Sequence, residues 1–187
     1  MSEVKWKEMN DTKLTVPDNI TFEDAIALTQ ELMGKMENDT ISPSQVQETV
    51  SQLVATSNGA RGFFVTYLTA DASLPDQPSE ALLAGLKTSP ELVSELLVKN
   101  VAMSTAMAIT HRRQENETMA QNSDRVQRRS ANLIRLLNNK LIQEKAQQMR
   151  DSALTGEGEA EVAFFDRWGY DQEQRSAIAQ SLEQLLG

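Results

Sequence analysis

The nonpolar positions of the chain are densest between Ser89 and Ile109, where they fall on every side of a helical wheel. Ser89 and Pro90 predict that a helix begins here, because serine caps free backbone N–H groups and proline lacks one. Only a thin polar strip remains, near Glu95 and Lys99. A helix that is nonpolar all round is typical of the interior of a helical bundle.

The residues after this helix are first polar and then amphipathic. Nonpolar side chains nearly vanish between His111 and Asp124, and a seam at three- and four-residue spacing follows: Val126, Ser130, Leu133, Leu137 and Leu141. The simplest arrangement of residues 89–142 is a long antiparallel helical hairpin that turns within 114–123. A single continuous helix is the alternative, because no glycine or proline forces the turn.

Capping residues indicate further helices on both sides of this segment. Helices are predicted from Thr21 to about Met36, from Ser42 to about Thr56, from Ser79 to Leu86, and after Asp171. Asn58 and Gly59 are expected to end the second of these helices.

Residues 60–69 contain aromatic and β-branched side chains, which favour a strand. No other segment offers a convincing partner strand, and a lone strand leaves its backbone groups without hydrogen bonds. We therefore expect a buried helix at 60–69.

These patterns predict an all-α protein, a bundle of six to eight helices built around the hairpin at about 89–142. Residues 1–20 are expected to form a polar N-terminal arm, in which Trp6 is a docking candidate, and residues 21–150 the bundle. An acidic, glycine-containing linker is expected at 151–160. A small C-terminal helical pair at 161–187 is then expected to pack on the bundle.

Composition narrows the function classes. The 187 residues carry a net charge of −9 and no cysteine, which excludes disulfides, thiolate catalysis and cysteine-ligated metals. The N-terminal residues lack the features of a signal peptide, so a cytoplasmic location is expected. Glu91, Glu95, Lys99 and Asn100 interrupt the most nonpolar run, so no membrane span is expected.

One basic cluster stands out in this acidic chain. Residues 111–140 hold seven Lys or Arg against three acids, a net charge of +4, which leaves −13 for the rest. Arginine offers forked donors that match carboxylate and phosphate groups, so the cluster is a candidate anion- or partner-binding face. The alternative is a solvated helix face balanced by acids of neighbouring helices. The candidate site residues are Arg112, Arg113, Arg125, Arg128, Arg129 and Arg135.

Catalytic and metal-binding motifs are missing from the sequence. His111 is the only histidine, and a helical di-iron site needs a second one. The sequence contains no nucleophile elbow and no glycine-rich phosphate loop. We therefore predict no catalytic residue, no metal and no cofactor.

The sequence favours a non-enzymatic interaction or regulatory protein that uses the Arg-rich face or a nonpolar groove. The expected partner is a protein with an acidic surface, and the chain is also a candidate for homo-oligomer formation. An enzyme or small-ligand binder that holds an anionic ligand between helices, with Arg61, Arg112 or Arg113, is the alternative. Nucleic-acid binding ranks third, because residues 111–150 offer no aromatic stacking platform.

Overall fold

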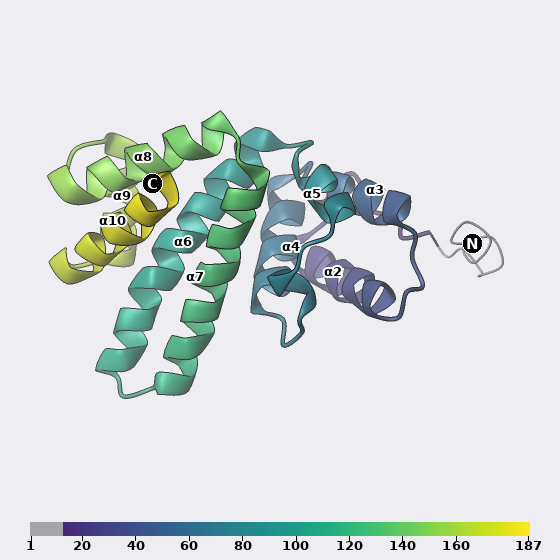
Figure 1. Cartoon of the computed structure of the whole chain (residues 1–187), viewed down its shortest axis with the longest axis horizontal. Coiled ribbons are helices and arrows are strands. Elements are labelled where there is room, and N and C mark those ends of the chain that lie inside the picture. The colour runs from purple at the N-terminus through teal and green to yellow at the C-terminus, as the bar shows by residue number, and fades with distance from the viewer. Residues whose placement is uncertain (1–12) are drawn as a thin grey trace. The chain divides into compact units, whose positions relative to one another are not determined.

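The computed structural model describes residues 13–187, and this part of the chain contains α-helices and no strand (Figure 1). The predicted all-α class is confirmed. Nine α-helices and one short 3₁₀ helix, η1, are described: α2 (Phe22–Glu37), α3 (Pro43–Leu53), α4 (Ser57–Thr69), η1 (Leu74–Asp76), α5 (Glu80–Leu86), α6 (Pro90–Arg113), α7 (Glu117–Leu137), α8 (Lys140–Thr155), α9 (Glu159–Trp168) and α10 (Gln172–Leu186).

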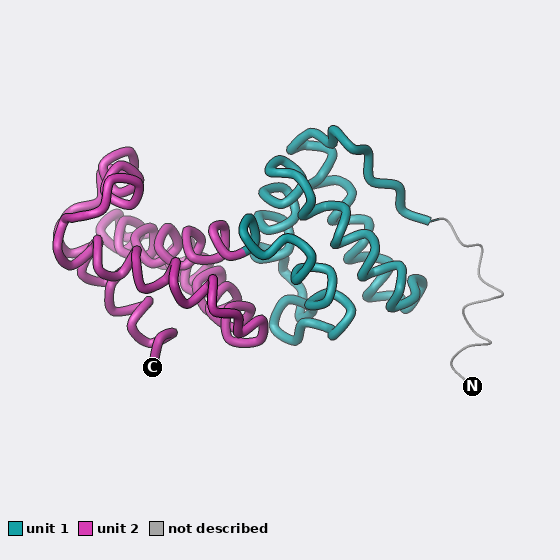
Figure 2. The backbone as a smooth tube through the Cα atoms, turned by 90° about the horizontal axis from the view of Figure 1, so that it is seen from above, with its two compact units in different colours: residues 1–93 teal, residues 94–187 magenta. Residues whose placement is uncertain are grey.

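The chain divides into two compact units, residues 1–93 and residues 94–187 (Figure 2). The boundary falls inside α6, after its first turn. We call residues 1–93 unit 1 and residues 94–187 unit 2.

Helices α2, α3 and α5 of unit 1 begin where their capping side chains predict. The Thr21 hydroxyl accepts a hydrogen bond from the Asp24 N–H at 3.1 Å, which fixes the start of α2. Ser42 and Gln45 form a complete capping box at α3, with Pro43 as the first helical residue. Such caps satisfy backbone N–H groups that the helix leaves free and are each worth about 1 kcal/mol.

The expected helix at 60–69 is confirmed as part of α4, which forms the centre of unit 1. Phe63 and Tyr67 stack with ring centroids 5.2 Å apart, and both side chains are fully buried. Burial of each such side chain stabilises the fold by roughly 1.5–3 kcal/mol. The contacts of α4 are chiefly with α2, and those of α5 are chiefly with α3.

The expected helix end at Asn58 and Gly59 is wrong. Helix α3 ends at Leu53, and Thr56 caps α4 by accepting a hydrogen bond from the Gly59 N–H at 3.1 Å. Asn58 and Gly59 therefore lie in the first turn of α4. Glycine is needed at 59 for space, because a Cβ there would lie 2.1 Å from the Leu53 carbonyl oxygen.

Unit 2 contains most of α6 and all of α7, and residues 114–116 join these two helices (Figure 1). Glu115 adopts a left-handed conformation in this turn, with φ 58°. The Arg112 guanidinium donates hydrogen bonds to Asp124 of α7, the shorter of which is 2.5 Å long. The predicted seam of α7 is buried at Ser130, Leu133 and Leu137.

The segment expected at 89–142 ends earlier than predicted. Asn138 takes a left-handed conformation with φ 39° and ends α7, and the Asn139 side chain caps α8. Asparagine tolerates this conformation better than most residues, so the break needs neither glycine nor proline. The segment after the turn therefore continues as two helices, α7 and α8. The described residues contain nine α-helices, compared with the six to eight predicted.

The C-terminal part differs from the expected linker at 151–160. Residues 151–155 continue α8, and only residues 156–158 separate α8 from α9. The helix predicted after Asp171 is present as α10, and Asp171 and Gln174 form its capping box. Gln174 also donates hydrogen bonds to the Ala106 carbonyl oxygen and to the Thr110 hydroxyl, which ties α10 to α6.

The N-terminal arm expected at 1–20 lies partly outside the described residues, and so does Trp6. Within 13–20, Leu14 and Ile20 are buried, and Lys13 forms an ion pair with Glu48 of α3 at 2.8 Å.

Candidate functional site

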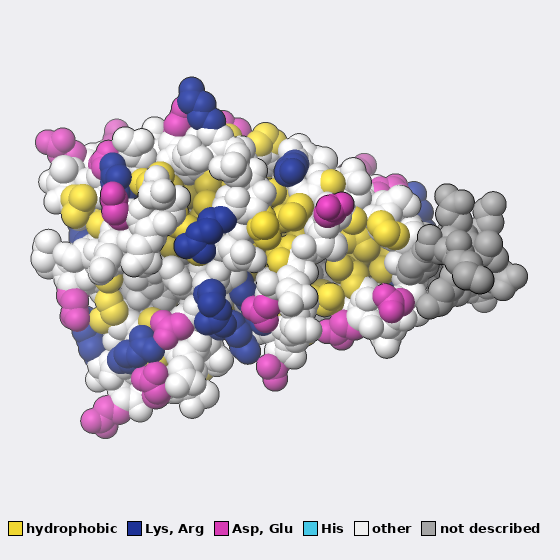
Figure 3. All heavy atoms as spheres, in the orientation of Figure 1, with side chains coloured by type: hydrophobic (Ala, Val, Ile, Leu, Met, Phe, Trp, Pro, Cys, Tyr) yellow, Lys and Arg dark blue, Asp and Glu magenta, His cyan; other side chains and the backbone are white. Residues whose placement is uncertain are grey.

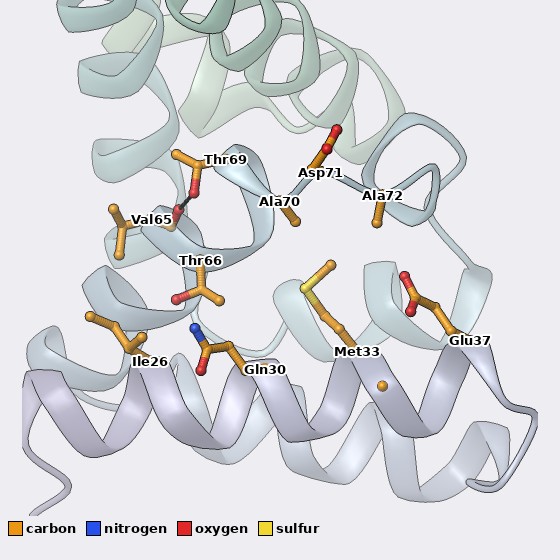
Figure 4. Close-up of a pocket in the computed structure, with 11 residues that line it drawn as sticks. Ile26, Gln30, Met33, Glu37, Val65, Thr66, Thr69, Ala70, Asp71 and Ala72 are labelled. Atoms are coloured by element: carbon orange, nitrogen blue, oxygen red, sulfur yellow. Dashed lines mark hydrogen bonds between the residues drawn. The ribbon is translucent and has the colours of Figure 1, made fainter.

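A groove lies in unit 1. Its volume is about 470 Å³, and it lies between α2, α4 and the three residues that follow α4. Its lining, shown in Figure 4, comprises Ile26, Gln30, Met33, Gly34, Glu37, Val65, Thr66, Thr69, Ala70, Asp71 and Ala72.

Two glycines give the groove its shape. A Cβ on Gly62 would lie 2.5 Å from the Ala25 Cβ and 2.8 Å from the Phe22 carbonyl oxygen, so α2 and α4 are in close contact there. Gly34 differs, because a Cβ there would meet no atom within 4 Å. A glycine inside a helix costs about 0.5–1 kcal/mol relative to alanine. At Gly34 no packing contact offsets that cost, and the position is open to the groove.

The two helices run in the same direction along the groove. Gly62 contacts Phe22 and Ala25 near the start of α2, whereas Met33 and Glu37 share the lining with residues 69–72 at the other end. The carboxyl ends of α2 and α4 therefore lie at the same end of the groove. Because each helix carries a partial negative charge at its carboxyl end, this end favours positively charged groups.

Two hydroxyl groups of the groove already form hydrogen bonds within α4. The Thr66 hydroxyl donates to the Gly62 carbonyl oxygen at 2.8 Å, and the Thr69 hydroxyl donates to the Val65 carbonyl oxygen at 2.6 Å. In Figure 4, Gln30 and Met33 point from α2 toward the α4 side of the groove. The groove thus offers nonpolar side chains and a flexible thioether, a combination that adapts to different nonpolar partners.

Charge is distributed unevenly between the two units. Residues 1–93 contain 14 acids and 6 Lys or Arg, a net charge of −8, and residues 94–187 contain 13 acids and 12 Lys or Arg, a net charge of −1. The groove lining includes the acids Glu37 and Asp71 and no Lys or Arg. On the face shown in Figure 3, hydrophobic side chains gather over unit 1.

The first two residues of the predicted arginine site are engaged within the chain. Arg112 donates to Asp124 at 2.5 Å and to Glu117 at 3.2 Å. Arg113 donates to Asp171 at 2.6 Å and also to Glu173, which links the end of α6 to the start of α10. These carboxylates raise the pKa of both guanidinium groups above their ordinary value. Both arginines therefore form ion pairs that link the end of α6 to other parts of unit 2.

The four arginines of α7 do not share one exposed face. Arg129 is buried, with 3 % of its surface exposed, whereas Arg128 and Arg135 are exposed and Arg125 is half-buried. Arg129 therefore does not belong to an exposed face with Arg128 and Arg135. In Figure 3, basic and acidic side chains are interspersed over unit 2.

A smaller cavity of about 270 Å³ lies within unit 2, between α6, α8 and α9. Lys99 and Lys145 both line it, opposite Glu161 and Phe164. Lys99 donates to Glu95 at 2.6 Å, and its Nζ lies 5.9 Å from the centre of the Phe164 ring. The hydrogen bond from Lys99 lowers the pKa of Glu95, and the charge of Lys145 acts in the same direction.

No group of three or more His, Asp or Glu residues is placed to hold a metal ion within residues 13–187. The His111 Nδ1 is buried and makes no hydrogen bond. The predicted absence of a metal and of a cofactor stays a prediction.

Within residues 13–187, one helix, α6, is long and nonpolar enough to cross a membrane by length and composition alone. Half of its most nonpolar 18-residue stretch is buried inside the fold. The core helix of a soluble bundle meets the same criteria, so this is weak evidence for a span. The expectation of no membrane span stays a prediction.

Comparison with protein families places residues 21–185 in one family model, described as uncharacterised conserved protein UCP020893. The chain belongs to this family. The matched region begins at the cap of α2 and ends within α10, so the family model covers helices of both units. Searches of curated proteins and of solved structures returned no match.

Sequence reasoning named a nonpolar groove as one possible contact surface but did not locate it between α2 and α4. Gly34 and Val65 carry no motif, and the sequence does not distinguish the open Gly34 from the tightly packed Gly62. The one available signal was a glycine inside a helical pattern, which marks either close packing or a functional surface. Lys99 and Lys145 were missed because they come from separate helices.

Proposed function

We propose that the chain is a non-enzymatic protein–protein interaction protein whose contact surface is the groove between α2 and α4. The observation that carries this proposal is Gly34, a helix-interior glycine that faces open space in a nonpolar groove. Helical proteins often bind partners by accepting a nonpolar segment into such a groove. Val65 at its margin is 43 % exposed, although it is a large hydrophobic residue.

The arginine site has less support as the main contact surface. Arg112 and Arg113 already donate to carboxylates of the same chain, so an acidic partner would have to displace those carboxylates. Arg128 and Arg135 are exposed and keep the prediction of an acidic partner open for α7. Nucleic-acid binding has the same weakness, because Arg112 and Arg113 are among its candidate cations.

Site-specific photo-crosslinking tests the groove as a contact surface. A photoreactive phenylalanine analogue at Val65 should crosslink a partner protein in cells of the native source. The same analogue at Gln52, an exposed position of α3 outside the groove lining, is the matched control. A partner captured at Val65 and absent at Gln52 supports the proposal. No crosslink at Val65, or equal crosslinks at both positions, contradicts it.

Small-ligand binding in unit 2 is the second candidate. It is favoured by the cavity that Lys99 and Lys145 line, where an anionic ligand would compete with Glu95 for the Lys99 ammonium group. A thermal-shift panel of small carboxylates and phosphates tests it. One of these anions should raise the Tm of the wild-type protein and leave that of Lys145→Ala unchanged. If no anion in the panel raises the Tm, this candidate is rejected.

A further inference from the structure

We infer that the occupant of the groove is a basic amphipathic helix of a partner protein, about three turns long. This inference rests on the proposed function and adds the chemistry of the partner. Four observations carry it: the length of the groove, its open floor at Gly34, its negative end, and the net charge of unit 1.

The length of the groove matches a short helix. Its lining on α2 extends from Ile26 to Glu37, which are separated by eleven helical steps. At 1.5 Å per residue this is roughly 17 Å, or about three turns. A groove between two parallel helices can accept a third helix. A helical partner would place nonpolar residues at i, i+3, i+4 and i+7 against Ile26, Met33 and Val65.

Gly34 gives the partner access to the floor of the groove. A Cβ at this position would meet nothing within 4 Å, so the first atom of a larger side chain projects into space that the protein does not fill. Met33 lies beside it and adapts its shape to the nonpolar side chains that it contacts. A partner side chain can therefore reach the backbone of α2 at Gly34.

The carboxyl-terminal end of the groove attracts a cation. Two effects combine there: the partial negative charges at the ends of α2 and α4, and the carboxylates of Glu37 and Asp71. In Figure 4 the Glu37 carboxylate lies on the side of Ala72, whereas the Asp71 carboxylate points away from α2 and so lies at the rim. A Lys or Arg at one end of the partner helix would complement this charge.

The electrostatic field of unit 1 also favours a basic partner. Of the four Lys and Arg residues within 13–93, Lys13 is paired with Glu48, and the Arg61 guanidinium lies 5.6 Å from the centre of the Phe22 ring. None of the four lines the groove. With a net charge of −8 on residues 1–93, the unit steers basic segments toward its surface and repels acidic ones.

Peptide binding to the full-length chain tests the inference. The probe is a fluorescein-labelled 14-residue amphipathic helix of leucine and lysine, and its control replaces every lysine by glutamate. Fluorescence anisotropy should show that the lysine peptide binds at least tenfold more tightly than the glutamate peptide. Its affinity should also fall as salt is raised. Equal affinity of the two peptides would overturn the inference.

Two matched pairs of variants locate the binding surface. Gly34→Leu places a side chain in the groove and should weaken binding of the lysine peptide at least tenfold, while the folded state keeps or gains stability. Gln52→Leu adds the same side chain to α3 outside the groove and should leave binding unchanged. Glu37→Lys should weaken binding several-fold, whereas Glu31→Lys, the same charge change on α2 outside the lining, should have a smaller effect. Binding that is indifferent to Gly34→Leu would overturn the inference.

The remaining outcomes separate this inference from the proposed function. If crosslinking at Val65 captures a partner whose contacting segment is acidic or uncharged, the groove is a contact surface and the basic-helix inference fails. If sedimentation shows a dimer of this chain that Gly34→Leu dissociates, the occupant is a second copy and the inference again fails. If nothing crosslinks at Val65, the proposed function itself fails.

Discussion

Gly62 and Ala25 are packed so closely that a Cβ on Gly62 would lie 2.5 Å from the Cβ of Ala25. The carbonyl oxygen of Phe22 is nearly as close, at 2.8 Å, and a backbone atom cannot rotate away as a flexible side chain can. This contact sets the distance between α2 and α4 at one end of the groove.

Gly62→Ala should therefore destabilise the protein by about 1–3 kcal/mol, because α2 and α4 must separate to admit the methyl group. Gly34→Ala is the matched control, and it should stabilise the protein by roughly 0.5–1 kcal/mol through better helix propensity. Urea unfolding followed by circular dichroism measures both. Equal effects of the two substitutions would show that the two glycines do not differ as described.

Arg129→Glu should destabilise the protein by on the order of 3–5 kcal/mol, because it replaces a buried cation with a buried anion. Arg128→Glu changes an exposed residue one position away and should shift the stability by less than about 0.5 kcal/mol. Thermal unfolding of the two variants is the measurement. If both variants unfold at the same temperature, Arg129 does not have the structural role that its burial indicates.

Asp171→Asn should lower the stability at neutral pH and have little effect in acid. The hydrogen bond from Arg113 and those from the backbone hold the pKa of the Asp171 carboxyl below its ordinary value in the folded protein. Its ionised form therefore stabilises the fold above the unfolded-state pKa of about 3.9, and this contribution is lost as the pH falls through the folded-state pKa. Asparagine still caps α10, so the cap itself is retained.

Urea unfolding at a series of pH values between about 7 and 2 measures this difference. The gap between wild type and Asp171→Asn should close as the solution is acidified. Glu157→Gln, which removes an exposed carboxylate from the connection between α8 and α9, is the control. A gap that stays constant down to the lowest pH would mean that Asp171 acts by means other than its charge.

Tyr170→Phe should leave the protein equally stable at pH 7 or stabilise it by up to about 1–2 kcal/mol. The Tyr170 hydroxyl is buried without a hydrogen-bond partner, and its removal relieves that cost. Burial also raises the pKa of Tyr170 to about 12. Since the unfolded tyrosine ionises near 10, stability should fall as the pH rises from about 10 to 12, and Tyr170→Phe should reduce that fall. A clear loss of stability at pH 7 would contradict this.

The sequence was most informative where a helix start depends on neighbouring residues. The helix starts predicted at Ser42 and Asp171 are present, and each has a capping box, which needs only atoms three residues apart. The end of α7 at Asn138 was not predicted. Asparagine occurs in helices and in left-handed caps, and its local sequence does not decide between them.

The candidate site was less predictable than the fold. Whether Arg112 and Arg113 are available depends on Asp124 and Asp171, which lie 12 and 58 residues away in the sequence. The buried position of Arg129 likewise follows from the packing of α7. The groove depends on how far apart α2 and α4 lie, a tertiary property that the residue pattern of either helix does not contain.

The division of the chain at residue 93 has a consequence for its synthesis. Each unit consists of one uninterrupted stretch of sequence, so every residue of unit 1 leaves the ribosome before any residue of unit 2. At about 5–20 residues per second, synthesis of the second stretch takes roughly 5–20 s, far longer than small helical domains need to fold. Unit 1 therefore has time to fold, with its groove formed, while the rest of the chain is still being translated.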